Sequence, residues 1–260
     1  MPSLIKKMVL HVLPRRYSWP RPLYPNDIFL VSYPRSGNTW VRFLIGNLLR
    51  GAEEDPVDFH TLPEAVPNLQ DKSHWPLIRN MSPPRLLKMH ELPDRRFRRV
   101  IYILRDGRDV TVSYYNYLCG LGKFQGSFPE FLRSRYGPWR WARHVSAWLN
   151  NPEDRELVMV RYEDLLVDTA QQLRRIAEFA NLPDDEDSIA RAVRHSRFEN
   201  VKKMEGTRGR PRWNDTNLKF ARKGKAGDWQ NWFEPAHIEE FNRQAGHILR
   251  QFGYADAESE

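Results

Sequence analysis

The stretch from Asp27 to Arg50 constrains the fold of this chain more than any other part of it. Residues 28–31 are a short apolar run, which is typical of a strand that is buried on both faces. A polar turn that contains Gly37 follows, and apolar side chains then recur at helical spacing until Leu49. The stretch therefore predicts a strand, a tight turn and an amphipathic helix.

The turn between this strand and this helix has the features of a phosphate-binding site. The first N–H groups of a helix have no partner within the helix, and the helix dipole places partial positive charge there. The turn adds a cation, hydroxyl groups and bare backbone, from Arg35, Ser36, Gly37, Asn38 and Thr39. It is not a Walker A loop. An ordinary strand-to-helix connection with a Ser or Thr cap explains the same residues.

Further buried strands alternate with helices along the chain. Apolar runs predict strands at residues 85–90, 100–105 and 156–162, and helical periodicity follows the last two. This alternation predicts an α/β fold, with one mainly parallel central sheet flanked by helices in a single domain. The expected segments are an N-terminal arm at 1–26, the domain at 27–253 and a disordered acidic tail at 254–260.

Composition narrows the ligand class and the compartment. The 260 residues carry a formal net charge of +8, which suits an anionic ligand, an acidic surface or nucleic acid. No recognisable nucleic-acid motif accompanies this charge. The single cysteine, Cys119, excludes an intrachain disulfide and favours a reducing compartment such as the cytoplasm. The eight histidines show no metal-ligand spacing, and no apolar run reaches the ~20 residues of a membrane span.

Lys88 and His90 lie two residues apart at the end of the predicted strand 85–90, so their side chains leave the same face of that strand. A histidine at a strand end is often an ordinary surface residue. A neutral imidazole is also well matched to accepting a hydroxyl proton near pH 7. The residues alone leave both interpretations open for His90.

Three segments together carry a resemblance to a known enzyme family. The first is residues 32–40, SYPRSGNTW, which is similar to a loop of the form T-Y-P-K-S-G-T-T-W. The second is residues 103–115, ILRDGRDVTVSYY, and the third is residues 220–229, FARKGKAGDW. In this order they resemble the donor-binding motifs of the cytosolic-type sulfotransferases, which use 3′-phosphoadenosine 5′-phosphosulfate (PAPS). The resemblance covers residues 27–229 and implies a PAPS-dependent sulfotransferase.

The resemblance also implies a role for each matching residue. It assigns the 5′-phosphosulfate to Arg35, Ser36, Gly37, Asn38 and Thr39. It assigns the rest of the nucleotide to Trp40, Arg105, Ser113, Tyr162, Ser196, Phe198, Arg222, Lys223 and Gly224, with Trp40 and Phe198 on the two sides of the adenine. It makes His90 the general base, and Lys88 and Arg35 the cations that stabilise the transferring group. The implied product is adenosine 3′,5′-bisphosphate (PAP), and no metal is implied.

Two residues depart from the family pattern. Arg35 stands where the family usually has lysine, and it keeps the charge but not the geometry of that residue. Glu91 separates His90 from Leu92 and Pro93, in a motif whose usual form is K-T-H-L-P. We expect Glu91 to be a partner of His90 or a competing base.

The acceptor is expected to be a small-molecule hydroxyl or amine. Loops around residues 51–84 and 114–138 would form its pocket, and their aromatic residues either line that pocket or pack in the core: Trp75, Tyr115, Phe124 and Phe128. Residues 202–228 are basic and glycine-rich and predict a loop that covers the nucleotide. The family's usual dimer signature, K-x-x-x-T-V-x-x-x-E, is not found near the carboxyl end, so the oligomeric state stays open.

Two other functions are consistent with parts of the sequence. One is an ATP-dependent kinase, against which the missing Walker A pattern and the cations for a 3′-phosphate argue. The other is a basic nucleotide- or RNA-binding module without turnover, which release of PAP would distinguish from an enzyme. The sulfotransferase interpretation predicts neither a nucleic-acid partner nor a membrane span.

Overall fold

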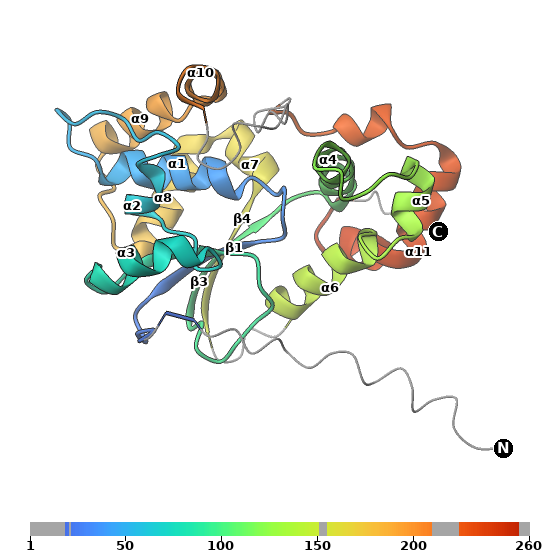
Figure 1. Ribbon diagram of the computed structural model, residues 1–260, viewed down its shortest axis with the longest axis horizontal. Helices are drawn as coiled ribbons and strands as arrows, with labels where there is room; N and C mark the ends of the chain where they lie inside the picture. The colour runs from blue at the N-terminus through green and yellow to red at the C-terminus, as the bar shows by residue number, and fades with distance from the viewer. Residues whose placement is uncertain (1–18, 21, 151–154, 210–223, 255–260) are drawn as a thin grey trace.

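The computed structural model describes residues 19–20, 22–150, 155–209 and 224–254. Its strands are β1 (Ile28–Ser32), β2 (Leu86–Met89), β3 (Arg99–Leu104) and β4 (Glu156–Arg161). Neighbouring strands run parallel, in the spatial order β2-β1-β3-β4 (Figure 1). The predicted α/β fold with a parallel central sheet is confirmed. Most of the predicted arm and tail lies outside the described residues.

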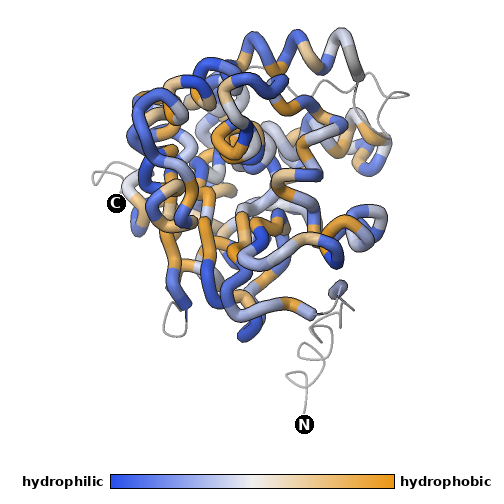
Figure 2. The backbone as a smooth tube through the Cα atoms, turned by 90° about the vertical axis from the view of Figure 1, so that its left-hand side faces the viewer, coloured by the Kyte–Doolittle hydropathy of each residue, from blue (hydrophilic) through white to orange (hydrophobic). Residues whose placement is uncertain are grey.

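Helices cover both faces of the sheet. One face carries α1 (Asn38–Leu49), α8 (Thr169–Ala180) and α9 (Glu186–His195), and the other carries α4 (Gly107–Gly120), α6 (Pro138–Leu149) and α11 (Pro235–Gln251) (Figure 1). Because side chains alternate along a strand, Ile28 and Leu30 pack toward α1, whereas Phe29 and Val31 pack toward α6 and α11. Both faces of β1 are therefore buried, and Figure 2 shows apolar residues along the strands.

Shorter elements connect these layers. They are α2 (Leu62–Ala65), η1 (Lys72–His74), α3 (Trp75–Asn80), α5 (Phe128–Arg133), α7 (Tyr162–Val167), α10 (Phe198–Arg208) and η2 (Asp228–Asn231). The helix α10 corrects the prediction of a loop from residue 202 onward. This helix is mostly polar, and its three apolar residues, Phe198, Val201 and Met204, form only a short stripe at its beginning. Val201 anchors it in a small apolar cluster with Phe43 and Val57.

A buried ion pair ties the beginnings of β1 and β2 together. The guanidinium of Arg85 donates to both carboxylate oxygens of Asp27, at 2.9 and 2.5 Å. It also donates to the carbonyl groups of Ile78 and Pro22, and its side chain is 2% exposed. The pair therefore fixes where β2 enters the sheet, and with it the position of the residues at the end of that strand.

Candidate active site

A cavity of about 940 Å³ opens where the parallel strands end, the edge at which open α/β sheets commonly bind ligands. Most of the predicted site residues line it: Arg35, Gly37, Asn38, Thr39, Trp40, Lys88, His90, Arg105, Ser113, Tyr162, Phe198 and Gly224. Ser36 and Ser196 do not line it, and Arg222 and Lys223 lie outside the described residues. The fold thus brings residues that follow all four strands to one place.

The turn between β1 and α1 contains two residues with positive φ. Gly37, just before α1, has a φ of 96°, and Arg35 has a φ of 73°. A Cβ atom on Gly37 would lie 2.5 Å from Cδ2 of Tyr162, so the turn requires glycine at this position. The hydroxyl of Ser36 is buried and has no hydrogen-bond partner among the described residues. This hydroxyl and the first N–H groups of α1 leave the turn with donors for an anion.

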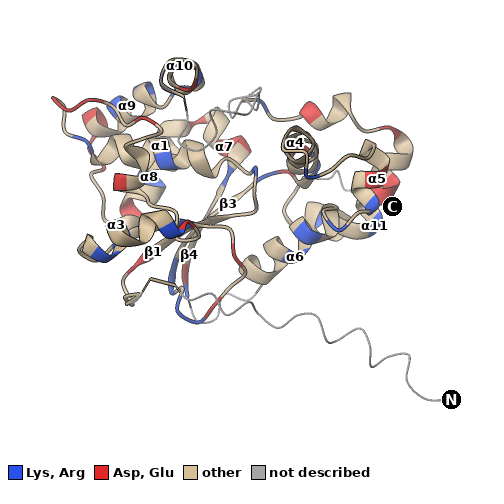
Figure 3. Ribbon diagram, viewed as in Figure 1, with Lys and Arg blue, Asp and Glu red and all other residues tan. Residues whose placement is uncertain are grey.

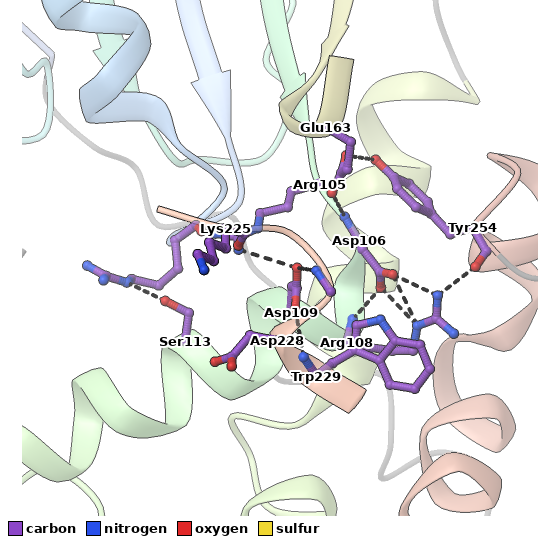
Figure 4. A network of polar contacts seen from close by, with 12 residues as sticks. Arg105, Asp106, Arg108, Asp109, Ser113, Glu163, Lys225, Asp228, Trp229 and Tyr254 are labelled. Carbon is purple, nitrogen blue, oxygen red and sulfur yellow. Dashed lines mark hydrogen bonds and ion pairs between the residues drawn. The ribbon is translucent and has the colours of Figure 1, made fainter. Parts of the chain in front are cut away.

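Arg105 is held at the edge of the cavity by groups from three segments. Its guanidinium donates to the carbonyl groups of Arg35, at 3.2 Å, and Lys225, at 3.0 Å, and lies 3.4 Å from the carboxylate of Asp109 (Figure 4). It also covers the ring of Tyr162, with 4.2 Å between the guanidinium carbon and the ring centroid. The Nε of Arg105 is buried without a partner in the described ranges, which leaves one donor for a ligand.

Arg35 reaches from the turn to α4. Its Nε donates to the hydroxyl of Ser113 at 3.1 Å, and its guanidinium carbon lies 5.0 Å from the ring centroid of Tyr117. The residues predicted for the 5′- and 3′-phosphates are therefore in direct contact. Figure 3 shows basic residues at this edge of the sheet, between the two layers of helices. Their charge suits a ligand with more than one phosphate.

Trp40 and Phe198 line the cavity from α1 and α10. The indole N–H of Trp40 donates to the carbonyl of Ser196 at 2.9 Å. The hydroxyl of Ser196 is buried and accepts from the Asn47 side chain at 3.0 Å. The contact of Ser196 with the nucleotide stays a prediction, and its carbonyl holds Trp40. Gly224 packs closely on Phe198, since a Cβ atom there would lie 2.6 Å from Cδ2 of the ring.

His90 is fixed through its backbone and its ring. Its Nδ1 lies 2.7 Å from the carbonyl oxygen of Ser32, which can only accept, so Nδ1 carries the proton and donates. Its backbone N–H donates to the side chain of Gln70 at 2.8 Å. This tautomer leaves a lone pair on Nε2. Burial and the neighbouring charge of Lys88 hold the pKa of His90 well below its usual range, so the ring is neutral at pH 7.

Glu91 is not a hydrogen-bond partner of His90, which corrects the first of the two roles expected for it. Its carboxylate accepts from the side chain of Gln70 at 2.6 Å, and its carbonyl accepts from the indole N–H of Trp148 at 2.9 Å. In the described part of the chain, no hydrogen bond joins Glu91 to His90. The side chain of Gln70 thus binds the carboxylate of Glu91 and the backbone N–H of His90.

Lys88 lies in the cavity wall with His90. Its Nζ is 3.5 Å from Oδ1 of Asn68, a residue that forms a parallel bridge with Lys88 at the edge of β2. Burial and the neighbouring charge of Arg42 lower the pKa of Lys88 to about 7. Arg42 also lines the cavity, from α1. The sequence does not single out Arg42, because one charged residue on an amphipathic helix normally belongs to its solvent-exposed face.

The aromatic residues considered for the acceptor pocket belong to packed clusters. Tyr115 contacts Phe124 and Phe128 edge-on, and Trp75 packs against the main core. None of these four residues lines the cavity. The wall beyond the predicted site residues combines apolar and polar groups, which include Phe59, His60, Leu62, Asn68, Asp71, Ser73, His74, Leu77, Tyr114 and Tyr117.

The described residues contain no group of three or more His, Cys, Asp or Glu side chains that could hold a metal ion. None of their helices combines the length and the apolar character that crossing a bilayer demands. Cys119, on α4, forms no disulfide.

Known proteins resemble this chain in sequence and in fold. A family model described as the sulfotransferase domain matches residues 25–253. Sulfotransferase 1B1 of Canis lupus familiaris is 30% identical and that of Mus musculus 28% identical, each over 84% of this chain and 81% of the relative. The structure of retinol dehydratase with retinol and PAP has 25% identity and a TM-score of 0.64, covering 88% of this chain and 82% of that chain. Mouse sulfotransferase SULT7A1 with PAP has 21% identity and a TM-score of 0.66, covering 90% of each chain. This chain belongs to the sulfotransferase family.

Proposed function

We propose that this sulfotransferase moves a sulfuryl group from PAPS onto a hydroxyl group, or less readily an amine, of a small molecule, with His90 as the general base. One observation carries the proposal: a single cavity joins the phosphate-binding turn, Arg105 and Ser113 to His90 and Lys88. The related retinol dehydratase structure holds PAP together with retinol. A nucleotide donor and a small acceptor would share the cavity here in the same way.

The basic edge of the cavity suits the two phosphate-bearing ends of the donor. The turn from Arg35 to Thr39 would bind the 5′-phosphosulfate at the beginning of α1, where the hydroxyl of Ser36 has no partner in the described ranges. Arg105 and Ser113 would bind the 3′-phosphate, with the unused Nε of Arg105 as one donor. PAPS would supply a sulfuryl group that is activated by its phosphate leaving group.

The adenine would lie between the rings of Trp40 and Phe198. Both rings line the cavity, and the Trp40 ring is fixed by the hydrogen bond to the Ser196 carbonyl. Tyr162 also lines the cavity, and the guanidinium of Arg105 packs on the face of its ring. Arg222 and Lys223, which lie outside the described residues, stay predicted contacts of the 3′-phosphate, with Gly224 beside them.

His90 has the properties that a general base needs. The carbonyl of Ser32 binds Nδ1–H and so leaves the lone pair of Nε2 to accept the proton of the attacking hydroxyl. The lowered pKa keeps this lone pair unprotonated at neutral pH. The Ser32 carbonyl would also stabilise the imidazolium that forms, because it accepts the Nδ1 proton more strongly when the ring is charged.

Lys88 and Arg35 would stabilise the charge that develops during transfer. Sulfuryl transfer, like phosphoryl transfer, depends on in-line positioning and on stabilisation of charge on the non-bridging and leaving oxygens. Lys88 is beside the proposed base, and Arg35 is in the turn that would bind the 5′-phosphate. In this proposal both cations would lie close to the transferring group.

The compartment follows from the same interpretation. The single cysteine and the resemblance to cytosolic-type sulfotransferases support a place in the cytoplasm. The phosphates of PAPS, rather than nucleic acid, would account for the basic charge of the site.

Calorimetric titration with PAP, with AMP as the control, tests the donor site. We expect tight binding of PAP and weak binding of AMP, because AMP lacks the 3′-phosphate that Arg105 and Ser113 would bind. Release of PAP from PAPS in the presence of a phenol or alcohol acceptor then tests turnover. Equal or absent binding of PAP and AMP would reject the donor assignment and favour an ATP- or RNA-binding protein.

A further inference from the structure

The cavity wall contains a cation, Arg42, to which neither the proposed donor contacts nor the proposed transfer step assigns a role. Arg42 is on α1, three residues after Thr39 and thus on the same side of the helix, about 4.5 Å further from its N-terminus. Its Nε and Nη2 both donate to the carbonyl oxygen of Val66, at 2.9 and 2.6 Å. Two bonds to one oxygen fix the plane of the guanidinium against the end of α2.

One end of this guanidinium remains available. Nη1 of Arg42 makes no hydrogen bond to any described residue. It is also not fully buried, because the fully buried atoms without a partner do not include it. Because Arg42 lines the cavity, a ligand there can reach this end. The side chain is therefore oriented in advance, by Val66, with donors left over for a second partner.

The charges around Arg42 do not balance it. The charge of Arg42 lowers the pKa of the neighbouring Lys88, so these two cations repel each other, while Asp71 and Glu91 act on Lys88 in the opposite direction. Two carboxylates line the cavity, and both have other partners: Glu64 pairs with Arg50 at 3.3 Å, and Asp71 accepts two hydrogen bonds from Ser73. No described residue forms an ion pair with Arg42 or Lys88.

An unbalanced cation in a cavity wall is costly unless a ligand brings the opposite charge. Arg42 stays charged, since burial lowers its pKa only to about 10. Lys88 already faces the proposed transfer centre, beside His90. The remaining positive charge on this side of the cavity therefore belongs to Arg42.

We propose that the acceptor carries an anionic group, a carboxylate or a phosphate, which Arg42 binds while the acceptor's hydroxyl lies at His90. The inference rests on the proposed sulfotransferase function and names the substrate class within it. The adjoining wall fits a hydrophilic molecule, because Asn68, Ser73 and His74 line it together with Leu77. Arg42 would be a specificity-determining residue, not a participant in the transfer step.

Matched pairs of acceptors test this inference on the PAP-saturated protein. The pairs are 4-hydroxyphenylacetate with 4-hydroxyphenylacetamide, D-glucuronate with D-glucuronamide, and glucose 6-phosphate with glucose. We expect the anionic member of at least one pair to bind about tenfold to hundredfold more tightly, as a charge-assisted bidentate contact would provide. The first two pairs report a carboxylate site, and the third reports a phosphate site.

Three variants assign this preference to its residue. Arg42→Gln should abolish the preference and Arg42→Lys should keep part of it. Arg174→Gln, which removes an exposed cation of α8 that does not line the cavity, should leave it unchanged. Comparable melting temperatures of the Arg42 variants would show that they fold.

PAP titration of each variant separates this inference from the proposed function. Failure of the wild-type protein to bind PAP would reject the function itself. Normal PAP binding without any preference for an anion, including the case in which neither member of a pair binds, would reject only the role of Arg42. An equal loss of turnover with anionic and neutral acceptors in Arg42→Gln would place Arg42 at the donor and would also overturn the inference.

Discussion

The carboxylate of Asp109 accepts a hydrogen bond from the backbone N–H of Gly227, at 2.8 Å. Oδ1 of Asp109 accepts from the N–H of Trp229 at 2.9 Å. Oδ2, the oxygen that accepts from Gly227, also lies 3.4 Å from the guanidinium of Arg105 (Figure 4). One buried side chain of α4 thus holds both a proposed donor-binding arginine and the segment that contains Gly224. The position of that segment over the cavity and the orientation of Arg105 are coupled through Asp109.

Asp109→Asn should weaken PAP binding about tenfold or more. The amide has nearly the same shape, but it cannot accept both backbone N–H groups and it leaves Arg105 without its ion pair, a loss of about 1–3 kcal/mol. Calorimetric titration measures the change. Asp185→Asn is the matched control, because Asp185 only caps α9 at the surface. An unchanged affinity in folded Asp109→Asn would contradict the coupling.

His90→Asn should lower kcat about 100- to 10,000-fold, the range that general-base catalysis contributes. Asparagine can still donate toward the carbonyl of Ser32, so the change removes the proton acceptor with little disturbance of the loop. The affinity for PAP should stay within about twofold of wild type. Steady-state kinetics and PAP titration measure the two effects, with exposed His247→Ala as the control. Near-normal turnover with normal PAP binding would show that another group takes the proton.

The activity should fall at alkaline pH because Lys88 loses its proton there. The pKa of this residue is about 7, so it carries its charge below pH 7 and loses it above. Because kcat/KM reports the free enzyme, kcat/KM for PAPS should fall about tenfold per pH unit above that value. His90 contributes no loss in this window, since its pKa lies well below its usual range and its neutral form is the active one.

Lys88→Arg separates this fall from other causes. Arginine keeps its charge throughout the range, so the variant should show a nearly flat profile between pH 7 and 9, at whatever absolute rate its different geometry allows. Lys88→Met should be slow at every pH. A wild-type profile that is flat from pH 6 to 9 would show that Lys88 does not titrate there or that its charge has no part in the reaction.

The sequence predicted the sheet and its edge well because the buried strands are continuous apolar runs. Residues 28–31 and 100–105 read as strands from this pattern alone, and parallel pairing then brings their carboxyl ends together. The helix α10 was not predicted, because Val201 is the one deeply buried side chain among its described side chains and only Phe198 and Met204 extend its apolar face. Local pattern is informative only where an element buries a whole face.

The contacts across the cavity could not be predicted from the sequence for a different reason. The orientation of Arg42 depends on the carbonyl of Val66, and the partner of Glu91 is Gln70, twenty-one residues away. Such pairings arise from how loops fold over the strand ends. The hydrogen bond between the Asn47 side chain and the hydroxyl of Ser196, 149 residues away, is a pairing of the same kind.

Gly37→Ala should impair PAP binding more than it impairs folding. An alanine pays about 1–2 kcal/mol for the positive φ, and its Cβ must also displace the ring of Tyr162, which supports Arg105. Gly122→Ala is the matched control, since Gly122 has a φ of 65° with nothing within 4 Å of an added Cβ. Both variants should lose the stability that the positive φ costs, with a further loss in Gly37→Ala from the displaced Tyr162 ring, and only Gly37→Ala should lose PAP affinity. Equal affinities would show that the turn can shift without consequence.

The buried pair of Asp27 and Arg85 should matter for stability and not for chemistry. Asp27→Asn would leave the Arg85 guanidinium buried without its counter-charge, which typically costs about 3–5 kcal/mol. Urea unfolding should show this loss as a lower midpoint with an unchanged slope, while kcat per folded molecule stays near the wild-type value. The double variant Asp27→Leu with Arg85→Met should recover part of the loss, because it removes the uncompensated charge. A drop in kcat per folded molecule in Asp27→Asn would mean that the beginning of β2 also sets the position of His90 at its end.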